Sequence, residues 1–257
     1  MAFINKGWRL IATACCFFIF GFGGLLMTLF WFPLYPLFYR DLRQRKQASR
    51  VAVHYSFKGF IWLMCKLGVM QIKCVGLSKL RQLHGKIIIA NHPSLIDVVV
   101  LISLIKNADC VVKQDLWQNV FIRGIIKATG YLSNADPEAL ISQCNESLEQ
   151  GNNLIIFPEG TRTKPNGKLN FRRGAANLAL RCNVNVQVIL IQVTPSTLTK
   201  GQPWYQIPSK KFTFYLEVKD EFDVSPYNTG NISLSVRKLT RDVEQNFVQE
   251  LNNELTS

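Results

Sequence analysis

The sequence predicts an α/β domain with a mostly parallel central sheet flanked by helices, preceded by an N-terminal membrane-anchoring helical segment. Three observations predict this fold class. An apolar segment without a single charged residue occupies positions 10–39 of the 257-residue chain. After it, short β-branched runs typical of buried strands alternate with stretches of helical periodicity. Two of those runs end abruptly in polar turns, and strand ends are where α/β proteins expose reactive groups.

The segment Leu10–Phe32 is long enough to cross a bilayer, at about 1.5 Å of rise per residue over ~30 Å. We interpret it as an anchor rather than a cleaved signal peptide, because its apolar core is too long and no small-residue cleavage pattern closes it. Pro33 and Pro36 are expected to end the helix. The Gly-Phe-Gly-Gly stretch at 21–24 leaves open a helix that enters one leaflet, or a hairpin.

The rest of the chain divides into strand and helix patterns. Strands are predicted at residues 86–90, 153–158, 186–193 and 211–218. Helices are predicted at residues 53–70, 98–105, 172–182 and 236–251, the last from apolar residues that recur every three or four positions. The sequence leaves open whether the helix at 53–70 lies on a membrane or packs on the domain.

The net charge of +13 indicates an acidic partner, and anionic lipid, an acidic carrier protein and nucleic acid all fit by charge alone. A solvated basic surface is the structural alternative. The basic cluster Arg40–Arg50 directly follows the apolar segment, which favours a membrane surface and places the following domain on the cytoplasmic side. No basic helix or RNA-binding motif accompanies the charge, so nucleic acid is not expected. Seven cysteines without a C-x-x-C pair fit a reducing compartment.

The first polar turn places His92 and Asp97 five residues apart, between the strand at 86–90 and the following helix. Ser94 is a candidate N-cap for that helix. A carboxylate bonded to one imidazole nitrogen fixes the tautomer and leaves the other nitrogen able to take a proton from an alcohol. A histidine that only satisfies a strand end is the structural alternative. The chain has three histidines in all, so no histidine-rich metal site is predicted.

The second polar turn, Phe157–Thr163, follows the strand at 153–158 and brings an acid, a glycine, hydroxyls and a guanidinium together. Gly160 allows close approach of a ligand to the backbone, and Arg162 offers a planar fork for phosphate or carboxylate. A solvated loop with a surface ion pair is the structural alternative. No P-loop, G-x-S-x-G or G-x-G-x-x-G motif occurs, and neither turn contains a cysteine. Any acyl transfer is therefore expected to be direct, without an acyl-enzyme.

The two turns together resemble the signatures of the glycerolipid acyltransferases, the 1-acylglycerol-3-phosphate O-acyltransferase or PlsC-like lysophospholipid acyltransferase superfamily. The segment Asn91–Asp97 is similar to its N-H-x-x-x-x-D signature, and Phe157–Thr163 is similar to its second signature. The resemblance covers roughly residues 56–218. It implies a bacterial inner-membrane enzyme that moves a fatty acyl chain from acyl carrier protein or coenzyme A to the hydroxyl of a lysophospholipid such as 1-acylglycerol-3-phosphate, without a bound cofactor.

In that scheme His92 is the general base and Asp97 its orienting partner. The residues implied in acceptor binding are Asn91, Glu159, Gly160, Thr161 and Arg162, the last holding a phosphate. The resemblance also implies a division into an N-terminal anchor with a basic juxtamembrane segment, residues 1–50, and an acyltransferase domain, residues 51–257.

Two departures from the family pattern concern the acceptor. Family members usually carry an arginine at the end of a strand between the two signatures, whereas Thr129–Leu140 occupies that region here without one. The later proline-containing strand motif is replaced by Asn183–Pro195. A specialised hydroxyl acceptor, such as a secondary lipid or a polyene-type product, therefore stays beside lysophosphatidate as an expectation. A non-catalytic protein that binds membrane lipid or a carrier protein is the alternative from another class.

Overall fold

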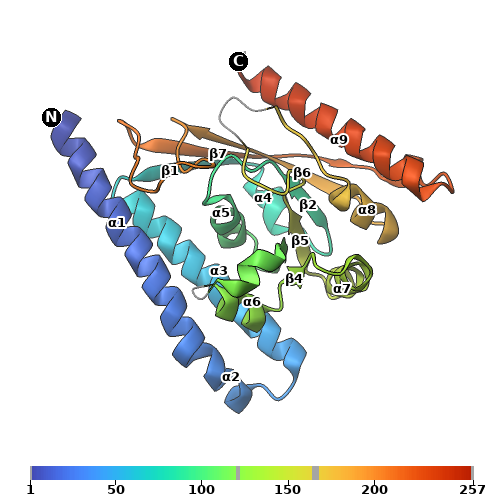
Figure 1. Ribbon diagram of the computed structural model, residues 1–257, viewed down its shortest axis with the longest axis horizontal. Coiled ribbons are helices and arrows are strands. Elements are labelled where there is room, and N and C mark those ends of the chain that lie inside the picture. Colours follow the sequence, from blue (N-terminus) through green and yellow to red (C-terminus); the bar gives the residue numbers. More distant parts are fainter. Residues whose placement is uncertain (1, 120–121, 164–167, 256–257) are drawn as a thin grey trace.

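The computed structural model describes residues 2–119, 122–163 and 168–255. Within them a seven-stranded sheet runs in the order β1-β7-β6-β2-β5-β3-β4, with helices on both faces (Figure 1). The strands are β1 Met70–Val75, β2 Ile87–Ala90, β3 Ala108–Val112, β4 Leu132–Ser133, β5 Asn153–Ile156, β6 Val186–Thr194 and β7 Phe212–Phe222. Neighbouring strands are parallel except β6 and β7, which confirms the predicted fold class.

Helices alternate with strands from β1 to β6, while the N-terminal helices precede β1 and the last helix follows β7. They are α1 Ala2–Leu26, a π-helical turn Met27–Trp31, α2 Phe32–Phe38, α3 Leu42–Lys66, α4 Leu77–Arg81, α5 Asp97–Leu104, α6 Arg123–Thr129, α7 Pro137–Glu149, α8 Gly174–Arg181 and α9 Ile232–Leu255, with short 3-10 turns at Gln114–Gln118 and Ser225–Tyr227. The helices predicted at 98–105, 172–182 and 236–251 correspond to α5, α8 and α9.

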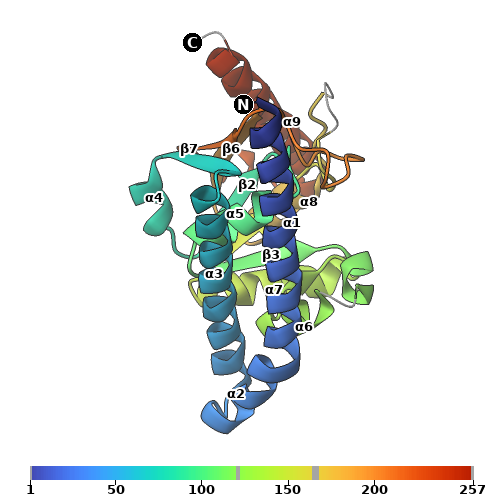
Figure 2. The ribbon, with the colours of Figure 1, turned by 90° about the vertical axis from the view of Figure 1, so that its left-hand side faces the viewer.

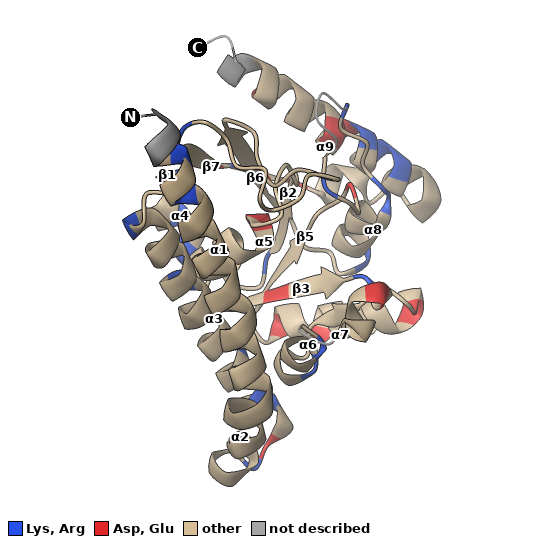
Figure 3. Ribbon diagram, turned by 60° about the vertical axis from the view of Figure 1, so that its left-hand side comes forward, with Lys and Arg blue, Asp and Glu red and all other residues tan. Residues whose placement is uncertain are grey.

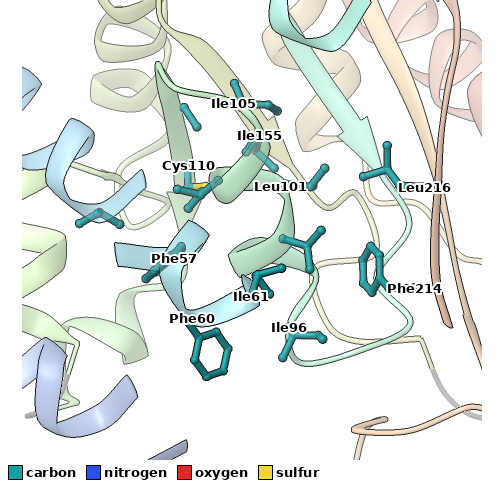
Figure 4. Packing of buried hydrophobic residues seen from close by; sticks show 14 of the residues in the cluster. Phe57, Phe60, Ile61, Ile96, Leu101, Ile105, Cys110, Ile155, Phe214 and Leu216 are labelled. Atoms are coloured by element: carbon teal, nitrogen blue, oxygen red, sulfur yellow. The ribbon is translucent and has the colours of Figure 1, made fainter. Parts of the chain in front are cut away.

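The sheet separates two hydrophobic clusters because successive side chains of a strand point to opposite faces. In β2, Ile88 and Ala90 join the cluster under α3 and α5, whereas Ile87 and Ile89 join the cluster under α7, α8 and α9. Figure 4 shows the first cluster, in which side chains of α3, α5 and β7 meet. All four residues of β2 are buried, which explains why its sequence is continuously apolar.

The N-terminal helices form a long hairpin, in which α1 and α3 lie side by side and α2 makes the turn (Figure 2). Residues Asn5–Phe38 are the one stretch of the described residues that is long and apolar enough to cross a membrane. The predicted stop at Pro33 and Pro36 is wrong, because the helical path continues to Phe38. Pro33 falls in the first turn of α2, where a missing N–H costs little, and the π-helical turn before it absorbs the irregularity.

Helix α3 packs on the domain, which decides between the two alternatives for the segment at 53–70. Its inward face is buried against the sheet cluster and α5; the buried apolar residues are Val53, Phe57, Phe60, Ile61 and Met64. The helix begins at Leu42 and ends at Lys66, so residues 67–70 lead into β1 instead of extending the helix. The expected boundary between residues 50 and 51 falls inside α3.

Candidate active site

The two polar turns follow neighbouring parallel strands, which brings them together at one edge of the sheet. Strand β2 pairs in parallel with β5, with Ile89 opposite Ile156. His92 lies two residues beyond the end of β2, and Glu159 lies three residues beyond the end of β5. Because carboxyl ends of parallel strands share an edge, residues far apart in the sequence become neighbours there.

His92 and Asp97 form a hydrogen-bonded pair. The distance between His92 Nδ1 and Asp97 Oδ2 is 2.7 Å, and the Asp97 side chain is fully buried while that of His92 is 16% exposed. Asp97 is the first residue of α5, and its Oδ2 also accepts the main-chain N–H of Ser94 at 2.8 Å. Ser94 is not the N-cap, since Ile96 occupies that position and the Ser94 hydroxyl donates to Thr197 O at 3.1 Å. The prediction that Asp97 reaches back to His92 agrees with this geometry.

The environment of Asp97 opposes its ionisation. Burial raises the pKa of Asp97 from 3.8 to about 6, while the hydrogen bonds from His92 and from Ser94 N–H act in the opposite direction. The nearby carboxylate of Glu159 also raises it. Above that pKa the ionised carboxylate faces the imidazole N–H, which is the arrangement that orients a histidine base.

Glu159 holds the turn that carries His92 through hydrogen bonds. Its Oε1 accepts the main-chain N–H of His92 at 2.9 Å and the hydroxyl of Thr163 at 2.8 Å. The main-chain N–H of Thr163 in turn donates to His92 O at 2.7 Å. Two of these bonds join the two sequence motifs, and the third, from Thr163 to Glu159, holds the second motif together. Glu159 is buried, so its carboxylate is held by protein donors at this edge of the sheet.

The imidazole ring of His92 is further fixed by Phe157, whose ring stacks on it at a centroid distance of 4.2 Å. Gly160 adopts a φ of +64°, a conformation that favours glycine, and a Cβ at that position would lie 3.1 Å from the Arg172 side chain. The turn thus needs glycine both for its backbone and for the approach of Arg172. Arg172 adds a second guanidinium near the Glu159–Gly160 peptide.

Arg162 connects the second motif to the loop between β6 and β7. Its Nη1 donates to Leu198 O at 3.0 Å and to Thr199 O at 2.9 Å. The same loop contacts the first motif, because Leu198 O also accepts the main-chain N–H of Leu95 at 3.0 Å. A guanidinium has five N–H donors. Among the described residues both bonds use Nη1, which leaves Nε and Nη2 as further donors.

Asn91 lies inside the sheet rather than at the surface of the site. Its Nδ2 donates to Ile191 O at 2.8 Å and its Oδ1 accepts Ile191 N–H at 2.8 Å, so the amide fastens the end of β2 to β6. Thr161 is half-buried in the turn between Gly160 and Arg162. Among the described residues no group of three or more His, Cys, Asp or Glu side chains is placed to hold a metal ion.

Three contributions to the site had no readable signal in the sequence. Phe157 and Thr163 belong to the second motif, but nothing in the motif indicates a ring stacked on His92 or a bond to Glu159. The Leu198 loop was missed because its contacts are made by main-chain carbonyls, and its positive φ of 55° falls on a leucine. A glycine there would have been the only local indication of such a turn.

The fold is α/β, and both joined motifs lie within one stretch that matches a known protein family. A family model described as Acyltransferase matches residues 71–192, which contain both motifs, and the resemblance expected from the sequence is confirmed.

The curated relatives reported below share one name, 1-acyl-sn-glycerol-3-phosphate acyltransferase. The chain is similar to the 1-acyl-sn-glycerol-3-phosphate acyltransferase of Helicobacter pylori, at 32% identity over 42% of this chain and 48% of that protein. It is also similar to the protein of the same name from Cocos nucifera, at 24% identity over 72% of this chain and 59% of that protein. The chain therefore spans about half the length of the curated relatives it matches.

A solved structure shares the whole fold. The crystal structure of the 1-acyl-sn-glycerophosphate (LPA) acyltransferase PlsC from Thermotoga maritima superimposes with a TM-score of 0.67 at 20% identity, covering 96% of this chain and 98% of that one. The similarity includes the N-terminal hairpin as well as the sheet.

Proposed function

We propose that this chain is a membrane-associated O-acyltransferase that moves a fatty acyl group from a thioester to the hydroxyl of a lysophospholipid of the 1-acylglycerol-3-phosphate type. The observation that carries this proposal is the 2.7 Å bond between His92 Nδ1 and Asp97 Oδ2, held at the sheet edge by Glu159. The family match and the names of the relatives support the reaction class.

In the proposed reaction His92 Nε2 removes the proton from the acceptor hydroxyl. At the same time the oxygen of that hydroxyl attacks the carbonyl carbon of the thioester. Asp97 accepts the Nδ1–H bond, which keeps Nε2 unprotonated and stabilises the imidazolium that forms. The tetrahedral intermediate collapses with loss of the thiolate, which takes the proton from His92. An ester and a free thiol of acyl carrier protein or coenzyme A result, so atoms and charge balance without a covalent enzyme intermediate.

The acceptor phosphate is proposed to bind beside the second motif. Arg162 presents its remaining donors there, and Arg172 lies against Gly160. A phosphate held by this turn is placed next to His92, because Glu159 bonds both turns together. In this proposal Thr161 and Gly160 contribute to the ligand surface, while Asn91 acts by positioning the end of β2.

The anchor is proposed to lie along the bilayer surface on the cytoplasmic side of the inner membrane. The N-terminal part of α1 is bonded to the domain, since Trp8 Nε1 donates to Leu67 O at 3.0 Å and Arg9 donates to Ser209 O. Farther along the hairpin, Thr28 packs directly against Gly124. These contacts at both ends favour a helix that lies on the bilayer over one that spans it. The outward face of α1, the π-helical turn and α2 is apolar; the exposed residues include Ile11, Phe18, Phe22, Leu29 and Leu37.

The experiment that tests this function is a transfer assay with detergent-solubilised protein, labelled acyl carrier protein or acyl-coenzyme A, and a panel of lysophospholipids and other hydroxyl lipids. His92→Ala is expected to lower the rate by about 10²–10⁴-fold. His84→Ala is the matched control, because His84 is exposed and lies outside both motifs. Full activity in His92→Ala would exclude histidine base catalysis.

The acceptor panel decides the substrate class. Transfer to 1-acylglycerol-3-phosphate supports the proposal as stated. Transfer only to another hydroxyl lipid supports the specialised acceptor that the arginine-free segment Thr129–Leu140 suggests. No transfer to any acceptor, with the protein still bound to acyl carrier protein or lipid, would favour the non-catalytic alternative. Labelled acyl chain trapped on a serine or cysteine would overturn direct transfer.

A further inference from the structure

A groove with a volume of about 860 Å³ lies between α2 and α3, at the turn of the N-terminal hairpin. Its volume falls in the ~300–1,000 Å³ range of sites that hold small molecules. One wall is apolar and comes from α2 and the π-helical turn before it, with Trp31, Leu34 and Phe38. The other wall comes from α3, where Arg43 and neighbouring glutamines are polar and the following turns contribute small apolar side chains. Such a groove fits an amphiphile rather than a wholly polar or wholly apolar ligand.

The groove is separate from the candidate active site. Gln150, which lines it, precedes β5, and Gln47, another lining residue, is bonded to Asn107 directly before β3 at 3.1 Å. Both positions mark the amino-terminal edge of the sheet. His92 and Glu159 lie at the carboxyl-terminal edge, so the groove and the base occupy opposite edges.

Hydrogen bonds of Tyr35 hold the floor of the groove in place. Tyr35 is buried, accepts Trp31 Nε1–H at 2.7 Å and donates to Ala48 O at 3.5 Å, which ties α2 to α3. The apolar wall around it stays open to solvent, with exposed fractions of 55% for Trp31 and 75% for Phe38. These side chains continue the outward apolar face of α1, which we propose to contact the bilayer.

The positive charge next to the groove favours a lipid with an anionic headgroup. Figure 3 shows basic positions at the start of α3, beside α2. The basic residues of that segment are Arg40, Arg43, Arg45 and Lys46, of which Arg43 lines the groove, and the acidic residues nearby are Asp41 and Glu146. Arg43 does pair with Glu146 at 3.3 Å, but the two side chains are 71% and 55% exposed. An exposed pair of this kind contributes little, so a phosphate can replace the carboxylate.

From this arrangement we infer that the α2–α3 groove binds one anionic glycerophospholipid of the membrane, with an acyl chain on the α2 wall and its phosphate at Arg43. The bound lipid is not a substrate of the proposed reaction, because it lies at the edge of the sheet opposite His92. It serves to seat the turn of the hairpin in an anionic bilayer.

Native mass spectrometry of the full chain, released from detergent micelles holding equal amounts of phosphatidylglycerol and phosphatidylcholine, tests this inference. We expect one phosphatidylglycerol adduct on the wild type. Gln44→Trp, which fills the groove from an exposed position, is expected to lose it. Gln245→Trp on the distant helix α9 is the matched control and is expected to keep it.

Arg43→Gln is expected to lower the preference for phosphatidylglycerol about fivefold, equivalent to ~1 kcal/mol for one basic residue near an anionic lipid. Arg241→Gln is its control, because Arg241 is also exposed and paired with a carboxylate, at 3.1 Å from Asp242. Equal retention of both lipids by the wild type, or an unchanged adduct in Gln44→Trp, would overturn the inference. Loss of acyl transfer to a micellar acceptor in Gln44→Trp would also overturn it, because the groove would then belong to the reaction.

Discussion

The main-chain N–H of His92 donates a hydrogen bond of 2.9 Å to Glu159 Oε1, across 67 residues of sequence. The same oxygen accepts the hydroxyl of Thr163 at 2.8 Å. The second motif therefore fixes the backbone from which the imidazole of the first motif projects. Glu159 is expected to influence the reaction through His92 as well as through any ligand it approaches.

Two substitutions of Glu159 distinguish its role as a hydrogen-bond acceptor from the role of its negative charge. Glu159→Ala leaves a buried N–H and a hydroxyl without a partner, and we expect it to lose about 1–3 kcal/mol of unfolding free energy. Glu159→Gln keeps an oxygen in the same position and is expected to retain most of the stability. Chemical unfolding in detergent, followed by tryptophan fluorescence, measures both. Equal losses in the two variants would show that the negative charge itself is required.

The buried carboxylate of Asp97 makes folding stability depend on pH. Its pKa is raised by burial to about 6 in the folded protein, above the ordinary value of 3.8. The folded state therefore binds this proton more tightly, and the resulting stability is complete below about pH 3.8 and lost as pH rises through about 6. Between pH 4 and pH 7 we expect Asp97→Asn to gain about 2 kcal/mol relative to the wild type.

Melting temperatures of the wild type and Asp97→Asn across that pH range measure this effect. Asp220→Asn is a suitable control because the Asp220 side chain is 96% exposed. Melting curves of the wild type and Asp97→Asn that shift in parallel from pH 4 to pH 7 would contradict the raised pKa of Asp97.

Asn91 is expected to act on rate rather than on substrate affinity. Both of its amide atoms bond Ile191 at 2.8 Å, so Asn91→Ala loosens the end of β2 and displaces His92. We expect a lower kcat with a KM for the acceptor that stays within about twofold. Steady-state kinetics with varied acceptor concentration distinguish the two cases. A raised KM at unchanged kcat would instead support the prediction from the sequence, in which Asn91 binds the substrate directly.

A buried ion pair joins the hairpin to the sheet. Arg50 Nη2 lies 2.7 Å from Asp109 Oδ2, and their side chains are 7% and 0% exposed. Arg50→Met leaves a buried carboxylate without its cation, bonded by the Ser147 hydroxyl and the Cys110 N–H, and is expected to cost about 3–5 kcal/mol. Adding Asp109→Leu is expected to recover part of that loss. Unfolding curves for the single and double variants test this, and strictly additive losses would argue against the pair.

The position of α1 at the membrane can be tested by labelling. If α1 lies along the cytoplasmic surface, a cysteine at Gly7, where a side chain meets no other atom within 4 Å, is reached only from that side. Gly7→Cys in right-side-out vesicles should therefore remain unlabelled by an impermeant maleimide and become labelled after permeabilisation. The parent chain without this substitution gives the background. Labelling before permeabilisation would indicate a spanning helix.

The strands that could be predicted are those with continuous apolar or β-branched runs, such as β2, β5 and β6. Strand β1 was missed because its inward residues alternate with Gln71 and Lys73, and β4 because two residues carry no pattern. Helix α7 was also missed, although Asp136 caps it by accepting the N–H groups of Glu138 and Ala139. That cap was a readable signal.

Within the candidate site, the pairing of His92 with Asp97 could be predicted because both residues lie in one short turn. The hydrogen bond from His92 N–H to Glu159 and the bonds from Arg162 to the β6–β7 loop could not be predicted, since they depend on which strands become neighbours. Asn91 shows the same limit, because a motif cannot indicate whether a polar side chain faces a ligand or the adjacent strand.

The pairing of β1 with β7 has a consequence for synthesis of the chain. Met70 lies opposite Phe212, so β1 can pair with β7 only after the ribosome has produced the residues of β7. Helix α1, in contrast, emerges first, with its apolar face uncovered. If α1 binds the membrane as proposed, the nascent chain reaches the lipid before the turns that carry His92 and Glu159 have been brought together.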